Sequence, residues 1–346
     1  MAAEAHATWD RPGAVTVAAG VHRIPLPLPG DGLRAVNVYA LEDRQGIVLL
    51  DTGSSHRDSI AALQLGLAAI GARITDISGI LCTHGHYDHY GLATQLSATS
   101  GASIALGEHE VGLVRAVADR DLHRHSMQER HRWLRYHGAD ALVEPTARAE
   151  QRRGSIAHAW RLPDQLLRDG DLVELDGRHL QVIGTAGHTR GHVVYFDVCH
   201  RLLFAGDHVL PRITPSLGFE PFPDGRALEL FLTSLEDVRD LGVDQVLPGH
   251  GAEFADLRGR ADALIAHHRE RLAICMDVLS DGVPHSAKEV ADRLKWTRRD
   301  RSFSELDVFN RMLAVMETVT HLEWLVLRGR LRREGNEELR TYAAMG

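Results

Sequence analysis

The chain has 346 residues, of which 44% are hydrophobic and 25% are charged, and its formal net charge is −8. This length accommodates one large domain and a smaller one, whereas the negative charge argues against broad affinity for nucleic acids. Since the sequence has neither a run of about eighteen apolar residues nor a basic segment followed by an apolar stretch in residues 1–13, we expect neither a membrane span nor a secretory signal.

The cysteines favour a reducing compartment. Cys82, Cys199 and Cys275 form an odd set without a pairing rhythm, and each lies in an apolar run or a predicted helix. We therefore expect buried free thiols and a cytoplasmic location.

Histidines are concentrated behind one of the first predicted strands. The strand Gly46 to Leu50 ends in Asp51, and the next, Ile77 to Thr83, leads into His84-x-His86-x-Asp88-His89. In extended backbone His84 and His86 point to the same side, and Asp88 and His89 open a predicted helix that runs to about Ser100. Crowded imidazoles destabilise a core unless something binds their lone pairs, so this density favours a metal site over a histidine-rich surface loop.

The same pattern, an apolar run closed by glycine with aspartate or histidine, recurs three more times. It appears as His179 to Ile183 before Gly187-His188-Thr189-Arg190-Gly191-His192, as Arg201 to Ala205 before Gly206-Asp207-His208, and as Gln245 to Pro248 before Gly249-His250-Gly251. Short strands with such endings predict sheets whose polar ends lie along one rim. One such turn is weak evidence, whereas five in one chain are strong evidence.

Residues 118–151 read as a less regular insertion that is rich in arginine and histidine. They are compatible with a solvated amphipathic helix on the edge of the predicted sheets, or with a cap that shapes a substrate pocket. Beyond residue 258, helices are expected over Ala261 to Leu279, Ser286 to Trp296 and Glu305 to Arg328. A hairpin is expected around Gly335-Asn336.

This C-terminal part resembles a winged helix, a module that often binds DNA. Residues 281–346 contain twelve Lys/Arg against eleven Asp/Glu, whereas a DNA-binding face needs a strong basic excess. We therefore expect the module to pack on the N-terminal part of the chain, to build part of the cleft beside the predicted metal site or to make a homodimer contact, and not to bind nucleic acid. His267 and His268 are read as core or surface residues.

The series from His84 to His250 resembles the metallo-β-lactamase-fold superfamily of hydrolases, and within it the glyoxalase II-like enzymes with two metals. The similarity covers about Val15 to Glu253. It implies an α+β fold, with a four-layer αββα sandwich at residues 1–257 and a winged-helix-like domain at residues 258–346.

The same resemblance implies roles for individual residues. His84, His86 and His188 hold one metal, Asp88, His89 and His250 hold the second, and Asp207 bridges them. Zinc fits these nitrogen and oxygen donors, and iron or manganese also remains open. Asp88 is the candidate catalytic residue, which orients the attacking metal-bound hydroxide and collects its proton. Asp51 is expected to bond a ligand imidazole or the loop backbone, and His192 and His208 to be structural, substrate-facing or ligand-supporting residues.

Departures from known branches narrow the substrate. Asp207 stands where some lactam-hydrolysing members carry cysteine, and Leu210 where acyl-homoserine lactonases carry tyrosine. The segment after Asp207 also lacks the basic loop of true glyoxalase II. The remaining expectation is a hydrolase of a small carboxylic thioester or ester. The alternatives are a phosphodiesterase or nuclease that uses the same metals, and a binding protein with a silent metal site.

Overall fold

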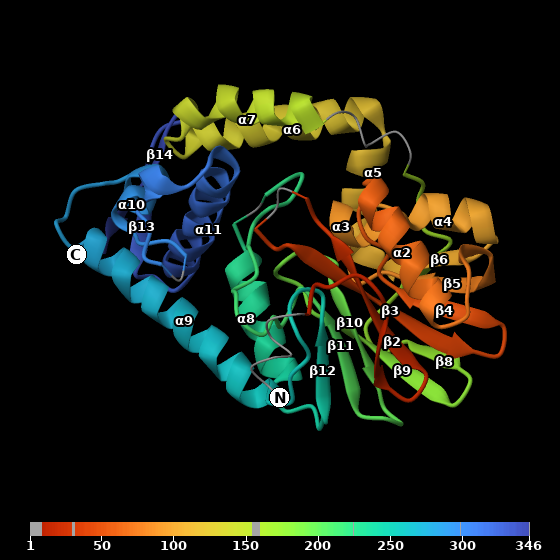
Figure 1. Ribbon diagram of the computed structural model, residues 1–346. Helices are drawn as coiled ribbons and strands as arrows, with labels where there is room; N and C mark the ends of the chain where they lie inside the picture. The colour runs from red at the N-terminus through yellow and green to blue at the C-terminus, as the bar shows by residue number, and fades with distance from the viewer. Residues whose placement is uncertain (1–8, 30–31, 154–159, 224, 298, 346) are drawn as a thin grey trace.

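The computed structural model describes residues 9–345 except 30–31, 154–159, 224 and 298. Two β-sheets face each other at its centre, and helices cover the outer side of each sheet (Figure 1). This is the four-layer αββα sandwich, of class α+β, that the sequence predicts.

The first sheet has seven strands in the order β1 to β7, antiparallel from β1 to β4 and parallel from β4 to β7. The strands are Val15–Ala18, Val21–Pro27, Ala35–Asp43, Gly46–Leu50, Ile77–Leu81, Ser103–Gly107 and Gln165–Leu167. Its helical layer consists of α2 (Arg57–Ala69), α3 (Tyr87–Tyr90), α4 (Ala93–Ser100) and α5 (Val111–Ala118).

The second sheet has five strands in the order β12-β11-β10-β9-β8. They are Gln245–Pro248, Leu202–Gly206, Val193–Asp197, Arg178–Gly184 and Leu172–Leu175, and only β11 and β12 pair in parallel. Its outer face is covered by α8 (Ala227–Val238) and by the C-terminal helices.

Alternating side chains bury both faces of the first sheet. In β3, Val36 and Val38 pack in the cluster that includes the α2 and α4 side chains. Tyr39 and Leu41 point to the other side, into the cluster between the two sheets. Because side chains alternate along a strand, one apolar run supplies two layers of core.

The single helix predicted from Asp88 to Ser100 is wrong, because α3 ends at Tyr90 and α4 begins at Ala93. The turn that follows β4 forms hydrogen bonds with backbone groups that would pair within a continuous helix. Thr52 N–H donates to the His89 carbonyl at 2.8 Å, and Leu92 N–H donates to the Gly53 carbonyl at 3.1 Å. The break therefore holds the loop with Asp51 against the histidine-rich segment.

Residues 118–151 are more regular than expected, and the alternative of an amphipathic helix agrees with the structure, whereas a cap over the substrate pocket remains a prediction. Residues 118–151 form most of a helical hairpin, α6 (Arg120–Tyr136) and α7 (Asp140–Arg153), which arches from α5 across to the C-terminal region (Figure 1). At its tip, the His137 ring stacks on Tyr342, with 6.3 Å between ring centroids, and Lys288 N–H donates to the His137 carbonyl at 3.1 Å. We call this hairpin the cap.

The C-terminal region follows the predicted order of helices and hairpin. It consists of α9 (Leu257–Val278), α10 (Ala287–Arg293), α11 (Val308–Leu327), β13 (Leu331–Gly335) and β14 (Arg340–Ala344). Apolar side chains of α11, α10, the cap tip and α8 share one hydrophobic cluster. The division into domains at residue 258 remains a prediction, since one core runs across it.

Two features concern the surface. Cys82 and Cys275 are buried free thiols, but Cys199 is exposed, because it lies in the turn after β10 where the apolar run has ended.

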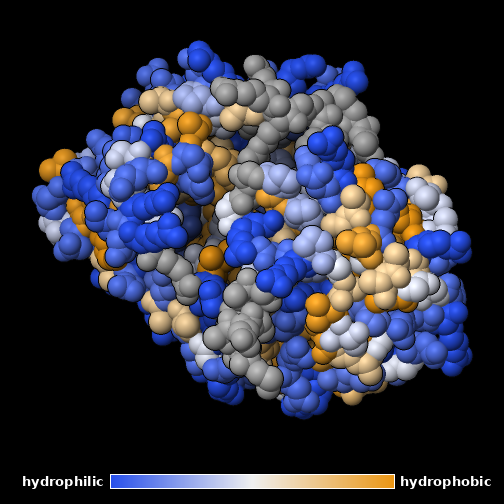
Figure 2. Space-filling model, viewed as in Figure 1, coloured by the Kyte–Doolittle hydropathy of each residue, from blue (hydrophilic) through white to orange (hydrophobic). Residues whose placement is uncertain are grey.

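Hydrophilic residues dominate the face shown in Figure 2, with apolar residues in separate patches. Among the described residues, no helix combines the length and apolar composition that a membrane-spanning helix needs.

Candidate metal centre

The ends of strands from both sheets bring the seven predicted ligands together. Their ligand atoms fall into overlapping groups in which every atom lies within 4.8 Å of the others, namely His84-His86-His188, Asp88-His89-His250 and His84-His89-Asp207. Six of the seven side chains are buried, and His86 is partly exposed. We call the first group the loop half and the second the sheet half, after the elements that support them.

In the loop half, each imidazole is held by its outer nitrogen. His84 Nδ1 lies 3.0 Å from Thr83 Oγ1, and His188 Nδ1 donates to the Ser216 carbonyl at 2.8 Å. His86 Nε2 lies 3.4 Å from the Phe219 carbonyl. A nitrogen that donates outward leaves a lone pair on the inner nitrogen, which is the tautomer that a metal ligand needs.

In the sheet half, the supports belong to the sandwich itself. His89 Nδ1 donates to Asp51 Oδ2 at 2.8 Å, and His250 Nδ1 donates to the Ala35 carbonyl of β3 at 2.7 Å. Asp51 also accepts from Thr83 N–H at 2.8 Å and has a positive φ of 62°, which is unusual for a residue with a side chain. The predicted role of Asp51 agrees with these contacts.

Asp207 lies between the two halves. Its Oδ2 is 3.6 Å from His188 Nε2 and 3.4 Å from His250 Nε2, and its Oδ1 is 3.5 Å from His89 Nε2. This position suits a carboxylate that bridges two cations.

The donor atoms fit a pair of metal ions. Within the described residues, four buried atoms of the cluster have no hydrogen-bond partner, namely His84 Nε2, His89 Nε2, His250 Nε2 and Asp207 Oδ1. His86 Nδ1 and His188 Nε2 are 3.0 Å apart, and the outer contacts leave a lone pair on both. Facing lone pairs and unpartnered buried polar atoms are costly unless a cation lies among them.

Burial and charge set different protonation states in the two halves. Burial lowers the pKa of His84 and His188, and lowers the pKa of His86 to about 3. In the sheet half burial also acts to lower the pKa of His250, but the carboxylates of Asp207 and Asp88 outweigh it and raise that pKa to about 10. The carboxylates of the sheet half therefore favour a positive charge beside them, which a bound cation would also supply.

Glycines and one buried glutamate allow the ligand loops to approach each other. A Cβ at Gly249 would lie 2.5 Å from Asp207 Oδ1 and 2.9 Å from His89 Cε1. Glu110, which is 1% exposed, accepts from Gly85 N–H at 2.6 Å and from Gly191 N–H at 2.7 Å, and so ties both histidine-rich loops together. The sequence reasoning missed Glu110, because Glu108 and Glu110 both follow the apolar strand β6 and nothing in the sequence marks which of them is buried.

The other histidines near the site lie outside the ligand groups. His192 Nε2 accepts from Asp207 N–H at 3.1 Å, and its Nδ1 lies 2.7 Å from Thr185 Oγ1, so the ring supports the bridging residue. His208 is fully buried against the Phe231 ring, and burial lowers its pKa to about 3. These contacts favour a ligand-supporting role for His192 and a structural role for His208.

A fourth potential ligand group, His267, His268 and Glu317, lies between α9 and α11. His268 is fully buried, and its Nδ1 is 3.1 Å from His321 Nε2, so it belongs to the packing of these helices. The interpretation of His268 as a core residue agrees with this position.

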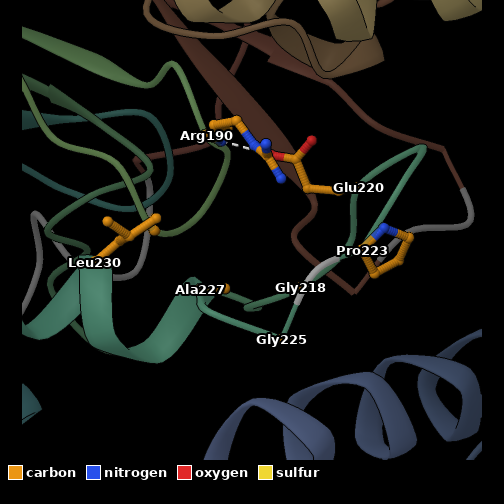
Figure 3. Close-up of a pocket in the computed structure, with 8 residues that line it drawn as sticks. Arg190, Gly218, Glu220, Pro223, Gly225, Ala227 and Leu230 are labelled. Atoms are coloured by element: carbon orange, nitrogen blue, oxygen red, sulfur yellow. Dashed lines mark hydrogen bonds between the residues drawn. The ribbon is translucent and has the colours of Figure 1, made fainter. Parts of the chain in front are cut away.

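Beside His188, the segment after β11 forms the wall of a small pocket (Figure 3). Its lining residues come from the turn before β10, from this segment and from the start of α8, and they are Gly187, Arg190, Gly218, Glu220, Pro223, Gly225, Ala227 and Leu230. Arg190 N–H donates to Glu220 Oε1 across it. The segment that forms this wall thus also contains Ser216 and Phe219, whose carbonyls contact His188 and His86.

Comparison with known proteins identifies the class of this fold and site. The family model of the metallo-beta-lactamase superfamily matches residues 31–250, so the chain belongs to this superfamily. The crystal structure of a metallo-beta-lactamase family protein from Thermus thermophilus is similar over 95% of this chain and 100% of that chain, with a TM-score of 0.81 and 30% identity. That coverage includes the C-terminal region.

Two relatives have names that specify a reaction. The acyl-coenzyme A thioesterase MBLAC2 of Gallus gallus is 26% identical over 246 residues, which are 70% of this chain and 81% of that protein. A hydroxyacylglutathione hydrolase of Fuscovulum blasticum is 28% identical over 185 residues, which are 51% of this chain and 52% of that protein. The chain is therefore a metallo-hydrolase of the superfamily and fits its glyoxalase II-like branch.

Proposed function

We propose that this protein is a dinuclear metal-dependent hydrolase of a small carboxylic thioester, or of a related ester. The observation that carries the proposal is the complete set of inward-facing ligand atoms, with Asp207 between the two halves. The thioesterase and the hydroxyacylglutathione hydrolase among its relatives support a thioester over other acyl compounds.

The chain would hold one ion with His84, His86 and His188 and the other with Asp88, His89 and His250, and Asp207 would contact both. This nitrogen and oxygen donor set fits zinc, iron or manganese. Two such ions, when bound, lower the pKa of a water molecule and polarise an acyl carbonyl.

Asp88 is the candidate catalytic residue of this set. Burial acts to raise its pKa, but His89 and His250 outweigh burial and lower the pKa to about 2. An ionised Asp88 accepts a hydrogen bond from the attacking water and fixes its direction toward the carbonyl carbon. We propose that it also receives the proton of that water.

A phosphodiesterase or nuclease is the second candidate, because two metals also stabilise phosphoryl transfer. The near balance of charge in residues 281–346, twelve basic against eleven acidic residues, argues against a nucleic-acid grip there. Thioester hydrolysis is therefore preferred.

A side-by-side substrate panel tests the proposal. The protein, reconstituted with zinc, iron or manganese in separate samples, is assayed on acyl-coenzyme A, acyl-glutathione, an aryl ester, an aryl phosphodiester and single-stranded RNA. We expect turnover of at least one thioester that is abolished by a chelator and restored by metal. Faster cleavage of RNA or of the phosphodiester than of every acyl substrate would replace this proposal with the second candidate.

A further inference from the structure

The described residues of the segment 214–226, which are all but residue 224, lie between the metal centre and the C-terminal region. On one side, the carbonyls of Ser216 and Phe219 accept from His188 and His86, which are two of the three residues of the loop half. The Phe219 ring also packs against the His86 ring, with 5.7 Å between centroids. The orientation of both imidazoles thus depends on where this segment places two main-chain carbonyls.

On its other side, the same segment rests on α11. Gly218 has a φ of +83°, and a Cβ there would lie 3.0 Å from Thr320 Cγ2 and 3.5 Å from the Met316 carbonyl. A Cβ at Gly225 would lie 2.9 Å from Glu323 Cγ. Figure 3 shows Gly218 and Gly225 on the stretch of chain that runs beside the blue C-terminal helix.

Aromatic contacts fix the middle of the segment from two directions. The Phe219 ring meets Phe309 of α11 edge to face, with centroids 5.5 Å apart. The guanidinium carbon of Arg130, from the cap helix α6, lies 5.3 Å from the Phe219 ring centroid. Phe219 is therefore held by the cap, by α11 and by a ligand imidazole at once.

We propose that α11 is a positioning element of the metal centre, which acts through its contact with Gly218 to hold the carbonyls of Ser216 and Phe219 and thereby the loop half. The inference rests on the dinuclear centre of the proposed function and assigns a role in metal binding to the C-terminal region. The sheet half is independent of this contact, because its imidazoles bond to Asp51 and to the Ala35 carbonyl.

The substitution Gly218→Ala probes the contact. The added methyl group would lie 3.0 Å from Thr320 Cγ2, which is closer than an ordinary contact, so we expect the segment to shift away from α11 and to carry Ser216 and Phe219 with it. Gly282→Ala is the matched control, because Gly282 also has a positive φ, +74°, but no atom would lie within 4 Å of a Cβ added there. It introduces the same kind of backbone strain without a neighbour.

Thr320→Ser supplies a rescue. It removes the Cγ2 methyl group that the alanine would meet and keeps the hydroxyl that donates to the Glu317 carbonyl at 2.9 Å. If the contact with α11 is the cause, Gly218→Ala combined with Thr320→Ser regains affinity that Gly218→Ala alone has lost.

Zinc binding to the apoprotein, measured by competition with a chromophoric chelator, reads out each half separately. The His250→Ala background reports the loop half, and the His84→Ala background reports the sheet half. Gly218→Ala should weaken zinc binding about tenfold or more in the His250→Ala background, as loss of a ligand-orienting partner commonly does. It should leave the His84→Ala background unchanged, and Gly282→Ala should change neither.

Other results would contradict either the role of α11 or the dinuclear centre. Equal weakening in both backgrounds, no weakening in either, or an equal effect of Gly282→Ala would overturn the role of α11, as would the failure of Thr320→Ser to restore binding. If neither background binds zinc, iron or manganese before Gly218 is changed, the dinuclear centre itself is refuted. Far-ultraviolet circular dichroism and thermal unfolding of each variant show whether the chain has folded.

Discussion

The two halves of the candidate metal centre differ in what holds them. The sheet half is anchored by groups inside or directly behind the sandwich, namely the Asp51 carboxylate and the Ala35 carbonyl. The loop half depends partly on two carbonyls of the segment 214–226, which itself leans on the cap and on α11. The sheet half is thus held by the sandwich alone, whereas the loop half is also held by the cap and by α11.

The two halves should therefore respond differently to changes outside the metal centre. A half fixed by a strand carbonyl changes only if the sheet changes. A half fixed by a surface segment can shift with any packing change in the cap or α11, because outer contacts set the direction of a ligand imidazole. We therefore expect substitutions in the two halves to act separately, except at the residue that touches both.

Asp207→Ala should have the largest effect, because it removes the carboxylate that faces His188 and His250 together. Two cations would then face each other with less compensation, so both should bind more weakly. We expect turnover to fall roughly a thousandfold or more, since each metal contributes several kcal/mol to stabilising the transition state. Metal analysis and kinetics on the folded variant check this, and near-normal turnover with two bound metals would show that Asp207 does not bridge.

Asp51→Asn should act mainly on the sheet half. The amide keeps the shape of Asp51 but loses the charge that His89 Nδ1–H now faces at 2.8 Å. Loss of such a partner commonly costs about 10–100-fold in metal affinity. The loop half should change less, because Asp51 reaches His84 only through Thr83 Oγ1. Zinc titration in the His84→Ala and His250→Ala backgrounds distinguishes the halves, and a larger loss in the loop half would contradict the comparison.

Glu110→Gln tests the link between the two histidine-rich loops. The carboxylate accepts two backbone N–H groups, so an amide that replaces it turns one acceptor into a donor facing Gly85 N–H or Gly191 N–H. A buried donor left without an acceptor costs about 1–3 kcal/mol. Urea unfolding of the metal-free protein should show this loss. Glu108→Gln, which affects surface ion pairs with Arg168 and His109, should stay within about 0.5 kcal/mol.

The clustering of the seven candidate ligands could be predicted from the sequence because each of them follows a recognisable strand. The observed β4 and β12 have the predicted bounds, Gly46–Leu50 and Gln245–Pro248, and the ligands or their supports come directly after them. The imidazoles of a dense histidine motif are side-chain groups, so the residue types alone indicate that they can bind a metal. The assignment of each ligand to an ion remains a prediction.

The supports of the loop half could not be predicted in the same way. Ser216 and Phe219 act through main-chain carbonyls, which every residue has, so their side chains give no signal. The regularity of the two cap helices could not be predicted, because α6 is rich in charged residues and buries few positions, among them Leu134. Its two helices are stabilised by packing on the C-terminal region, and that tertiary contact is not visible in a local pattern.

The smallest effect that we predict is that of acid on the contact between the cap tip and the C-terminal region, which supports the loop half indirectly. Burial, together with Arg340, lowers the pKa of His137 at the cap tip to about 3, against about 6.5 in an unfolded chain. Between these values the unfolded chain binds a proton that the folded chain does not, so stability falls as pH drops from 6.5 toward 3. The slope from one such group is at most about 1.4 kcal/mol per pH unit. In urea unfolding of the metal-free protein from pH 7 to pH 5, His137→Phe should flatten the dependence on pH. An unaltered slope for His137→Phe would show that the cap tip does not sense acid.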